Sequence, residues 1–331
     1  MIEPLLDTVV SAEEAQLETS LRPRVLTDFV GQPRLKDSLG VALQAAKKRH
    51  EPLDHVLLYG PPGLGKTTLA HIISHEQGGN IHVTSGPALT RAGDLAALLT
   101  NLEEGDVLFI DEIHRLSKVV EETLYSGMED QRLDLVLGKG PAARTVSIEL
   151  KPFTLVGATT RYGALSGPLR SRFGIINKLE YYSPKDLTTV LSRSAKILKI
   201  KLDPSATDSL AQRARGTPRI ANRLLRRARD TAEIRYHGHL GLEAVTETLK
   251  LLEIDALGLD ASDRDLLTHI IKHHRGGPVG IETLASALSE DVGTIEEVYE
   301  PYLIQQGLLT RTKQGRVVTS LAYTHLKLSH S

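Results

Sequence analysis

Residues 60–67 read Gly60-Pro61-Pro62-Gly63-Leu64-Gly65-Lys66-Thr67. The pattern G-x-x-x-x-G-K-[ST] is typical of a phosphate-binding P-loop, because its glycines let backbone amides approach phosphates at the start of a helix. The setting agrees, since the apolar run 55–59 precedes the loop and a helical pattern follows Lys66. We expect Lys66 to neutralise the β and γ phosphates and Thr67 to bind Mg²⁺. A glycine turn without a ligand is the alternative, and the lysine and threonine together argue against it.

Two further apolar runs end in polar residues that suit a nucleotide site. Residues 106–110 lead to Asp111 and Glu112. Asp111 would hold the metal, usually through water, and Glu112 would act as general base on the attacking water. A helix-capping acidic pair is the alternative. Residues 153–156 lead to two threonines, of which Thr160 is our candidate for contacting the γ-phosphate or orienting the water. Taken alone, such threonines are more often structural.

Length and composition describe an ordinary globular protein of two or three domains. The chain has 331 residues, of which 40% are hydrophobic and 24% charged, with a net charge of −1. No apolar run approaches a membrane span, and residues 1–20 lack the pattern of a secretory signal. The chain has no cysteine, which excludes disulfides and thiolate metal sites. We therefore expect a cytoplasmic protein whose contacts with nucleic acid, if any, use local basic patches.

The pattern along the chain predicts a leader and three domains. Residues 1–20 form the leader, and residues 21–183 alternate strands and helices, as expected of an α/β domain with a parallel sheet. A β-hairpin around residues 130–150 interrupts it, with a turn at Gly138-Lys139-Gly140; it is either a sheet ornament or a protruding contact element. Residues 184–256 form a small helical domain. Residues 257–331 have the order of a winged helix, with helices at 263–274, 281–289 and 294–306 and strands at 308–312 and 316–319.

Arginines outside the P-loop suggest two further roles. Arg172 lies at what we expect to be the far edge of the α/β domain, where an arginine can reach the nucleotide of a neighbouring subunit. Seven arginines and no acid lie between Arg213 and Arg229, and a solvated helix face is the usual explanation of such a run. Arg219, at the second position of the helix that begins with Pro218, would instead sense the γ-phosphate. Residues 307–331 carry no acid, and Arg311 and Arg316 are candidates for DNA backbone contacts.

Longer motifs resemble the AAA+ ATPases. Leu21-Arg22-Pro23, Asp111-Glu112-Ile113-His114-Arg115 and Gly157-Ala158-Thr159-Thr160-Arg161 fit that family, as does Gly216-Thr217-Pro218-Arg219. Gly276-Gly277-Pro278-Val279-Gly280 and Glu300-Pro301-Tyr302-Leu303 extend the similarity into the third domain. Over residues 21–320 the match is closest to the bacterial motors that drive branch migration of Holliday junctions in recombination and DNA repair.

The resemblance implies roles for individual residues. Thr160 matches the family's sensor 1, Arg172 its arginine finger and Arg219 its sensor 2. A homohexamer would translocate the duplex arms of the junction, using ATP and Mg²⁺. A junction-binding protein would dock on the hairpin at 130–150, with a junction resolvase as a further partner. The implied nucleotide contacts are Leu21, Arg22, Gly63, Leu64, Gly65, Lys66, Thr67, Thr68, Tyr182 and Arg219.

Two other classes of function compete with a DNA motor. A clamp-loader-like switch would use ATP to control assembly on DNA without sustained translocation. A protein-remodelling ATPase would bind a partner protein through its winged helix. A protein-threading ATPase would be expected to carry an aromatic pore loop after the P-loop helix, and residues 84–89 contain no aromatic residue. The DNA motor is therefore the favoured hypothesis.

Overall fold

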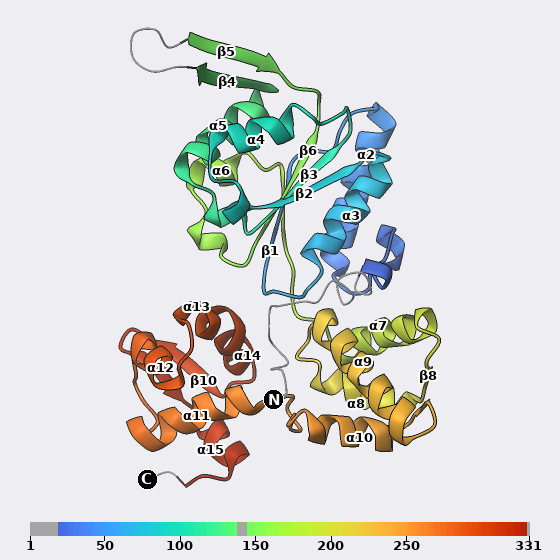
Figure 1. The fold of residues 1–331 in the computed structure, drawn as a ribbon, viewed down its shortest axis with the longest axis vertical. Coiled ribbons are helices and arrows are strands. Elements are labelled where there is room, and N and C mark those ends of the chain that lie inside the picture. Colours follow the sequence, from blue (N-terminus) through green and yellow to red (C-terminus); the bar gives the residue numbers. More distant parts are fainter. Residues whose placement is uncertain (1–18, 138–143, 330–331) are drawn as a thin grey trace. The chain divides into compact units, whose positions relative to one another are not determined.

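The computed structural model describes residues 19–137 and 144–329, which belong to two compact units. One unit comprises Arg22–Gly60 and Leu64–Glu180. The other comprises the described residues up to Leu21, Pro61–Gly63 and the chain from Tyr181 onward. The first is built on a sheet and the second mainly on helices (Figure 1). Among the described residues, no helix combines the length and apolarity needed to cross a lipid bilayer.

A five-stranded parallel sheet lies at the centre of the first unit. Its strands are β1 Val56–Tyr59, β2 Ile81–Ser85, β3 Val107–Asp111, β6 Thr154–Thr159 and β7 Ile175–Lys178, in the order β2-β3-β6-β1-β7. The three central strands are almost entirely buried, as expected of parallel strands covered on both faces. They are the predicted strands, so the parallel α/β domain is confirmed. The edge strands β2 and β7 were not predicted, because they are half-buried and mix polar with apolar residues.

Helices cover both faces of this sheet. The α-helices are α2 Pro33–Arg49, α3 Lys66–Gln77, α4 Ala92–Leu99, α5 Lys118–Glu129 and α6 Gly167–Ser171, and the 3₁₀ turns are η1 Leu26–Asp28, η2 Gly86–Ala88, η3 Ile113–Arg115 and η5 Tyr162–Ala164. Helices α2 and α3 lie on one face, and α4, α5 and α6 on the other (Figure 1). Alternate strand residues point to opposite faces, so Leu108 and Ile110 of β3 join a buried core with Leu95, Leu99 and Leu124.

The predicted β-hairpin is present. Strands β4 Arg132–Leu137 and β5 Arg144–Glu149 pair antiparallel, with Leu133 opposite Ile148. Leu133 is fully buried in the same core as α5, and the strands extend away from the sheet beyond α4 and α5 (Figure 1). The predicted turn at Gly138-Lys139-Gly140 lies outside the described residues.

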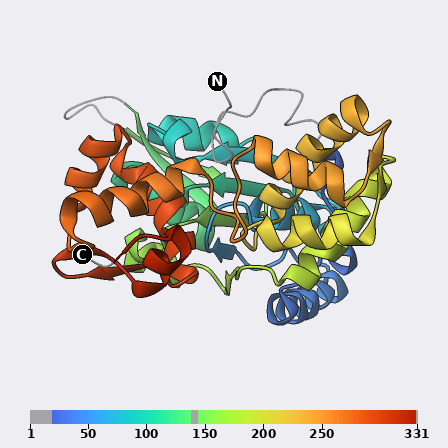
Figure 2. The same cartoon turned by 90° about the horizontal axis from the view of Figure 1, so that it is seen from below.

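The first part of the second unit is a bundle of four helices (Figure 2). They are α7 Pro184–Ile197, α8 Pro204–Arg213, α9 Pro218–Arg235 and α10 Leu242–Leu251, with a two-residue bridge between β8 Lys201–Leu202 and β9 His239–Leu240. Helix α7 begins with a capping box, in which Ser183 and Asp186 bond reciprocally to backbone amides, and Pro184 fits the first position. The predicted apolar face of α7, Leu187, Val190 and Leu191, is buried. We call this bundle the lid.

The second part has the winged-helix order. Its elements are α11 Ala261–His274, α12 Ile281–Leu288, α13 Val292–Thr294, η6 Ile295–Tyr299, α14 Glu300–Gln305, β10 Leu309–Thr312, β11 Gly315–Val318 and α15 Ser320–Leu326. The helix predicted over 294–306 contains a π-helical turn at η6. Pro301 accounts for it, because proline lacks an N–H and its ring clashes with the carbonyl four residues earlier. Helix α15 was not predicted, yet Ala322 and Tyr323 complete the core of this domain.

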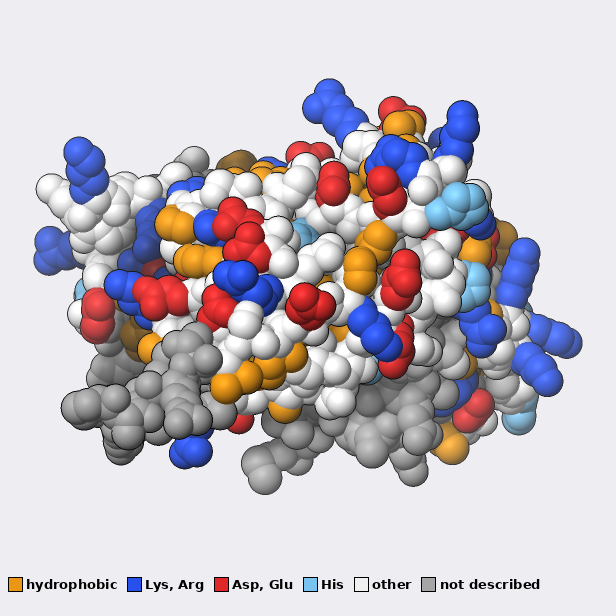
Figure 3. Space-filling model, turned by 90° about the horizontal axis from the view of Figure 1, so that it is seen from above, with side chains coloured by type: hydrophobic (Ala, Val, Ile, Leu, Met, Phe, Trp, Pro, Cys, Tyr) orange, Lys and Arg blue, Asp and Glu red, His pale blue; other side chains and the backbone are white. Residues whose placement is uncertain are grey.

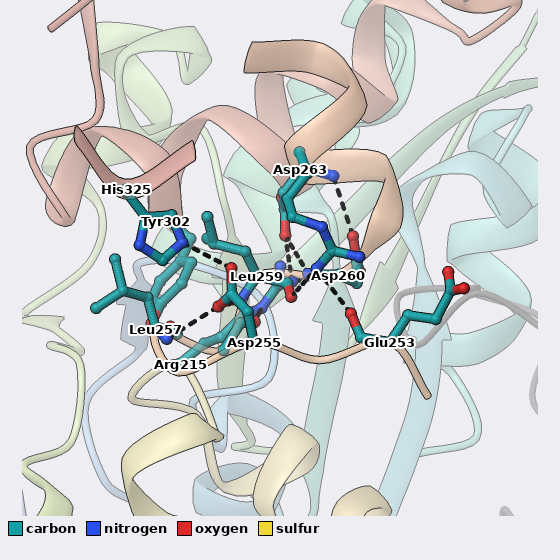
Figure 4. A network of polar contacts seen from close by, with 11 residues as sticks. Arg215, Glu253, Asp255, Leu257, Leu259, Asp260, Asp263, Tyr302 and His325 are labelled. Atoms are coloured by element: carbon teal, nitrogen blue, oxygen red, sulfur yellow. Dashed lines mark hydrogen bonds and ion pairs between the residues drawn. The ribbon is translucent and has the colours of Figure 1, made fainter. Parts of the chain in front are cut away.

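A buried ionic cluster joins the lid to the winged helix (Figure 4). Arg215, just before α9, pairs with Asp263 of α11 and with Asp260, the N-cap of that helix; the side chains of Arg215, Asp263 and Asp260 are 2%, 0% and 8% exposed. Its Nε donates to the carbonyl of Gly258 at 2.7 Å, and its guanidinium carbon lies 5.1 Å from the ring centroid of Tyr302. Removing one partner of a buried ion pair costs about 3–5 kcal/mol, because the other charge is left uncompensated. The cluster therefore ties the start of α9 firmly to the winged helix.

The chain between the two parts is also held in place. The Oδ1 of Asp255 accepts hydrogen bonds from the amides of Leu257 and Leu259, both at 2.9 Å, and its Oδ2 lies 2.7 Å from Nε2 of His325. The hydroxyl of Tyr302 donates to the carbonyl of Leu257 at 2.6 Å. The connection is thus a set of fixed turns rather than a flexible linker (Figure 4).

Candidate nucleotide-binding site

The P-loop adopts a backbone that requires glycine. Gly60 has a φ of 144°, and a Cβ at this position would lie 2.5 Å from the carbonyl oxygen of Leu179. Gly65 has a φ of 101° and precedes the first residue of α3. Because glycine has no side chain, the first turn of α3 is not covered by a capping group from this position. A helix start of this kind is suited to bind phosphate.

Lys66 is buried at the first position of α3. Its side chain extends back over the loop, and its Nζ donates to the carbonyl of Gly60 at 2.9 Å. Burial lowers the pKa of Lys66 to about 8, although Asp111 and Glu112 oppose this shift. Both carboxylates therefore lie close enough to act on the lysine charge. The site holds a cation that is poorly solvated, which a phosphate would stabilise.

The parallel register brings the predicted polar residues to one edge of the sheet. Tyr59 lies beside Thr159 in the pairing of β1 with β6, and Ser85 beside Asp111 in the pairing of β2 with β3. Strands β3 and β6 also pair directly, up to Ile110 and Gly157. The P-loop, Asp111 and Thr160 all follow the carboxyl ends of these strands, where parallel sheets bind their ligands.

Asp111 and Glu112 occupy the end of β3 in different ways. The Oδ1 of Asp111 accepts a hydrogen bond from the amide of Glu112 at 2.9 Å. Glu112 has a left-handed backbone with a φ of 47°, which turns the chain sharply into η3. Its carboxylate pairs with Arg115 at 2.9 Å, and both side chains are more than a third exposed. Exposed pairs contribute at most about 1 kcal/mol, so this contact leaves the carboxylate available to a water molecule.

The two threonines after β6 have different surroundings. Thr159 is buried, its hydroxyl lies 2.9 Å from Nδ1 of His114, and it also accepts from the amide of Arg161. Thr160 is partly exposed at the sheet edge. Thr159 is therefore the structural residue of the pair, and Thr160 is placed where a ligand would be accessible.

The other predicted nucleotide contacts are distributed between the two units. In the first unit Leu64 is buried, Thr67 and Thr68 are partly buried, and Arg22 lies near His71 of α3, where it adds to the effect of burial in lowering the histidine pKa. In the second unit the amide of Arg219 faces the carbonyl of Gly63 at 3.5 Å. Tyr182 is buried and donates its amide to Gly216, and Leu21 is buried with its carbonyl bonded to Arg193.

Arg172 caps the carboxyl end of α6 and contacts helix α5. Its Nη2 donates to Glu129 and its Nη1 to the carbonyl of Pro168, both at 2.8 Å. The guanidinium carbon also lies 4.2 Å from the ring centroid of Tyr125. Glu129 and Tyr125 were not identified from the sequence, although they are four residues apart and therefore share one helix face.

The predicted DNA contacts fall into two different environments. Arg311 of β10 is 57% exposed and pairs with Glu296 at 2.8 Å. Arg316 of β11 is only 7% exposed at its side chain, and it pairs with Glu300 and with Glu296. The guanidinium of Arg316 is thus enclosed and paired with carboxylates, which favours a structural role for this arginine. A DNA contact by Arg316 stays a prediction, and Arg311 is the more accessible of the two candidates.

The features described above are those of one class of ATPase. AAA+ ATPases combine a parallel sheet that carries a P-loop and adjacent carboxylates with a helical lid, and this chain has all of these parts. It adds a winged helix, a domain of the kind that binds DNA.

Comparison with known proteins gives the particular family. Residues 21–179 match the model of the P-loop domain of the Holliday junction DNA helicase RuvB, residues 182–255 that of the RuvB AAA lid domain, and residues 256–327 that of the RuvB C-terminal winged-helix domain. The chain therefore belongs to the RuvB family, and it is an ATPase.

Solved structures agree with this assignment. The structure titled Thermotoga maritima RuvB Holliday junction branch migration motor is 53% identical to this chain, with a TM-score of 0.86. The match covers 94% of this chain and 99% of that one. Two variants of Thermotoga maritima RuvB match with a TM-score of 0.87 at 53% and 52% identity, covering 93% of this chain and 99% of theirs.

The shifted pKa of Lys66 predicts a pH dependence of ATP binding. The lysine must be protonated to pair with the phosphates, and in the free protein its pKa is about 8. Affinity should be constant below pH 8 and fall by up to about tenfold per unit above it. Calorimetry of ATP binding at pH 8, in buffers of different ionisation enthalpy, should show that the protein takes up protons when ATP binds, because Lys66 becomes protonated. Affinity unchanged between pH 8 and pH 9.5, with no proton uptake, would contradict this.

The antiparallel pair of β10 and β11, which we call the wing, carries Arg311 and Arg316. These two arginines should respond differently to replacement. Arg311→Ala should weaken duplex binding similarly for unrelated sequences. It should also make the slope of log binding constant against log salt concentration shallower by about 1, as expected when one phosphate contact is lost. Arg316→Ala should instead lower stability by about 3–5 kcal/mol, because it leaves buried Glu300 unpaired. Anisotropy over a salt series and denaturant unfolding measure these effects. A stable Arg316→Ala protein with selectively weakened DNA binding would show that the burial argument is wrong.

Proposed function

We propose that this chain is the ATP-driven motor that moves Holliday junctions during recombination and DNA repair. The observation that carries the proposal is the convergence of Lys66, Asp111, Glu112 and Thr160 at one edge of the sheet, in a chain that ends in a winged helix. Hydrolysis would change the position of the lid through Arg219. The buried contacts of Arg215 with α11 would then pass that movement to the winged helix.

Each polar residue at the carboxyl ends of the central strands would have one task in hydrolysis. Lys66 and the amides at the start of α3 would bind the β and γ phosphates. Glu112 would accept a proton from the attacking water, and Thr160 would orient that water or contact the γ-phosphate. Arg219 would contact the γ-phosphate from the lid.

The same site would hold Mg²⁺ and the nucleoside. The described residues contain no group of three or more His, Asp or Glu side chains able to hold a metal. Thr67 and Asp111 would therefore bind Mg²⁺ only together with the phosphates and water, as is usual for this ion. Bound Mg²⁺ would neutralise charge that develops on the phosphates. Leu21, Arg22 and Tyr182 would contact the adenine and ribose, alongside Gly63, Leu64, Gly65 and Thr68 of the P-loop segment.

We propose that the active assembly is a homohexamer in which Arg172 serves the site of a neighbouring subunit. Within its own subunit the side chain of Arg172 donates hydrogen bonds to Glu129 and to the carbonyl of Pro168, with no hydrogen bond or ion pair to Lys66, Asp111 or Glu112 among the described residues. An arginine supplied across an interface stabilises charge on the transferred phosphoryl group. The ring would then hydrolyse ATP only when subunits are correctly assembled.

Two further surfaces would contact partners. The wing, with exposed Arg311, would bind the DNA backbone of the junction arms without reading sequence. The hairpin at 130–150 would dock a RuvA-like junction-binding protein, and a RuvC-like resolvase would act on the same junction. Figure 3 shows the protein from above the view of Figure 1, and charged and hydrophobic side chains are interspersed on that face. Val146 of β5 is 40% exposed, so an apolar contact is available on the hairpin. Because its substrate is the chromosome, we place the motor in the bacterial cytoplasm.

Replacing the two central residues of the site should separate ATP binding from hydrolysis. Lys66→Ala should abolish detectable ATP binding, because phosphate charge is no longer neutralised. Glu112→Gln should bind ATP normally, yet reduce hydrolysis at least about 100-fold, as expected when a general base is lost. Nucleotide binding is measured by fluorescence of an ATP analogue and hydrolysis by phosphate release.

Glu104→Gln is the matched control, because Glu104 is an exposed glutamate on the same domain. It should bind and hydrolyse ATP as the unmodified chain does. Hydrolysis by Glu112→Gln at the unmodified rate would eliminate the general-base role.

A further inference from the structure

One face of α5 holds both ends of α6. Glu121, Tyr125 and Glu129 recur every four residues and therefore lie along a single side of the helix. At the start of α6, the hydroxyl of Ser166 donates to Glu121 and lies 3.1 Å from that of Tyr125, which also donates to Glu121. At its end, Arg172 contacts Tyr125 and Glu129. The short helix is thus fixed at two points.

The Arg172 guanidinium is held on three sides. Its carbon lies 4.2 Å from the centroid of the Tyr125 ring, Nη2 donates to Glu129, and Nη1 donates to the carbonyl of Pro168. As a result the side chain is only 19% exposed, although arginine at a domain edge would ordinarily be mobile. Each of the two terminal nitrogens carries a second N–H, so a held guanidinium can still donate two hydrogen bonds to a phosphate.

Glu129 contributes to orientation more than to stability. Its side chain is 55% exposed, and exposed ion pairs stabilise a fold only weakly. Its carboxylate does fix which way the planar guanidinium faces. An arginine that must reach a phosphoryl group loses much of its effect when it is misplaced by as little as 1 Å. Glu129 and Tyr125 are therefore placed to orient Arg172 before it meets a nucleotide.

We propose that Tyr125 and Glu129 are positioning residues that hold Arg172 ready for the nucleotide of a neighbouring subunit. The proposal rests on the role proposed above for Arg172. It differs from a latch, in which Glu129 would sequester the arginine and slow hydrolysis. It also differs from a surface pair that has no effect on the reaction.

The test compares Glu129→Gln with the unmodified chain under conditions where the assembly hydrolyses ATP. We expect kcat to fall about three- to tenfold with the KM for ATP within about twofold, because orientation of the arginine is lost while the subunit's own P-loop is intact. Glu122→Gln is the matched control, since Glu122 lies on the same helix and only approaches exposed Lys118 at 4.0 Å. It should leave both constants unchanged.

A double replacement tests whether Glu129 acts through Arg172. Glu129→Gln should have no further effect on kcat in an Arg172→Ala background, whereas independent roles would give multiplicative losses. Multiplicative losses, an unchanged kcat or a raised kcat in Glu129→Gln would each overturn the positioning role. If Arg172→Ala alone leaves kcat unchanged, the proposed role of Arg172 fails instead.

Subunit mixing supplies a readout that altered folding would not produce. Lys66→Ala subunits carry an intact Arg172 and Glu129, so they should raise the hydrolysis by Glu129→Gln subunits when the two are mixed. Activity that only falls in proportion to dilution would contradict action across the interface.

Discussion

Parallel pairing of β1, β3 and β6 is the constraint on which the site depends. Hydrogen bonding between these strands fixes their register, and the register determines that the P-loop, Asp111 and Thr160 emerge at one edge. The strands are buried on both faces, so a slip in register would expose apolar residues to water at considerable cost. The same edge leaves Lys66 poorly solvated, with a pKa lowered to about 8 by burial. The packing that buries Lys66 therefore also places a poorly solvated positive charge where phosphate would bind.

A second constraint lies in the other unit. Arg215 immediately precedes Gly216, and α9 begins two residues later with Pro218 and Arg219. Its buried pairing with Asp260 and Asp263 ties that helix start to α11. A residue proposed to sense phosphate and the domain proposed to bind DNA are therefore linked by a contact that is costly to break. This is a physical route by which a change at the nucleotide could reach the DNA without a flexible linker.

Sequence patterns predicted the parts of this molecule that depend on local chemistry. The P-loop, the buried strands β1, β3 and β6, the hairpin strands and the apolar face of α7 all follow from periodicity and residue type. The edge strands β2 and β7 were missed because half-buried strands carry mixed side chains. The burial of Arg316 depends on Glu296 and Glu300, which lie on another element, and tertiary pairing of this kind leaves no clear signal in one sequence. The same is true of Glu129 beside Arg172, and of Arg215 beside Asp263.

Hydrolysis at this P-loop is proposed to move a DNA junction. The most direct test of this proposal measures two rates in one reaction: strand exchange on a synthetic four-way junction and phosphate release, with the junction-binding partner present. As ATP is titrated, we expect both rates to rise together at a constant ratio, and a non-hydrolysable ATP analogue should support neither. Sustained branch migration with the analogue, or hydrolysis that varies with no change in migration, would show that the two are not coupled.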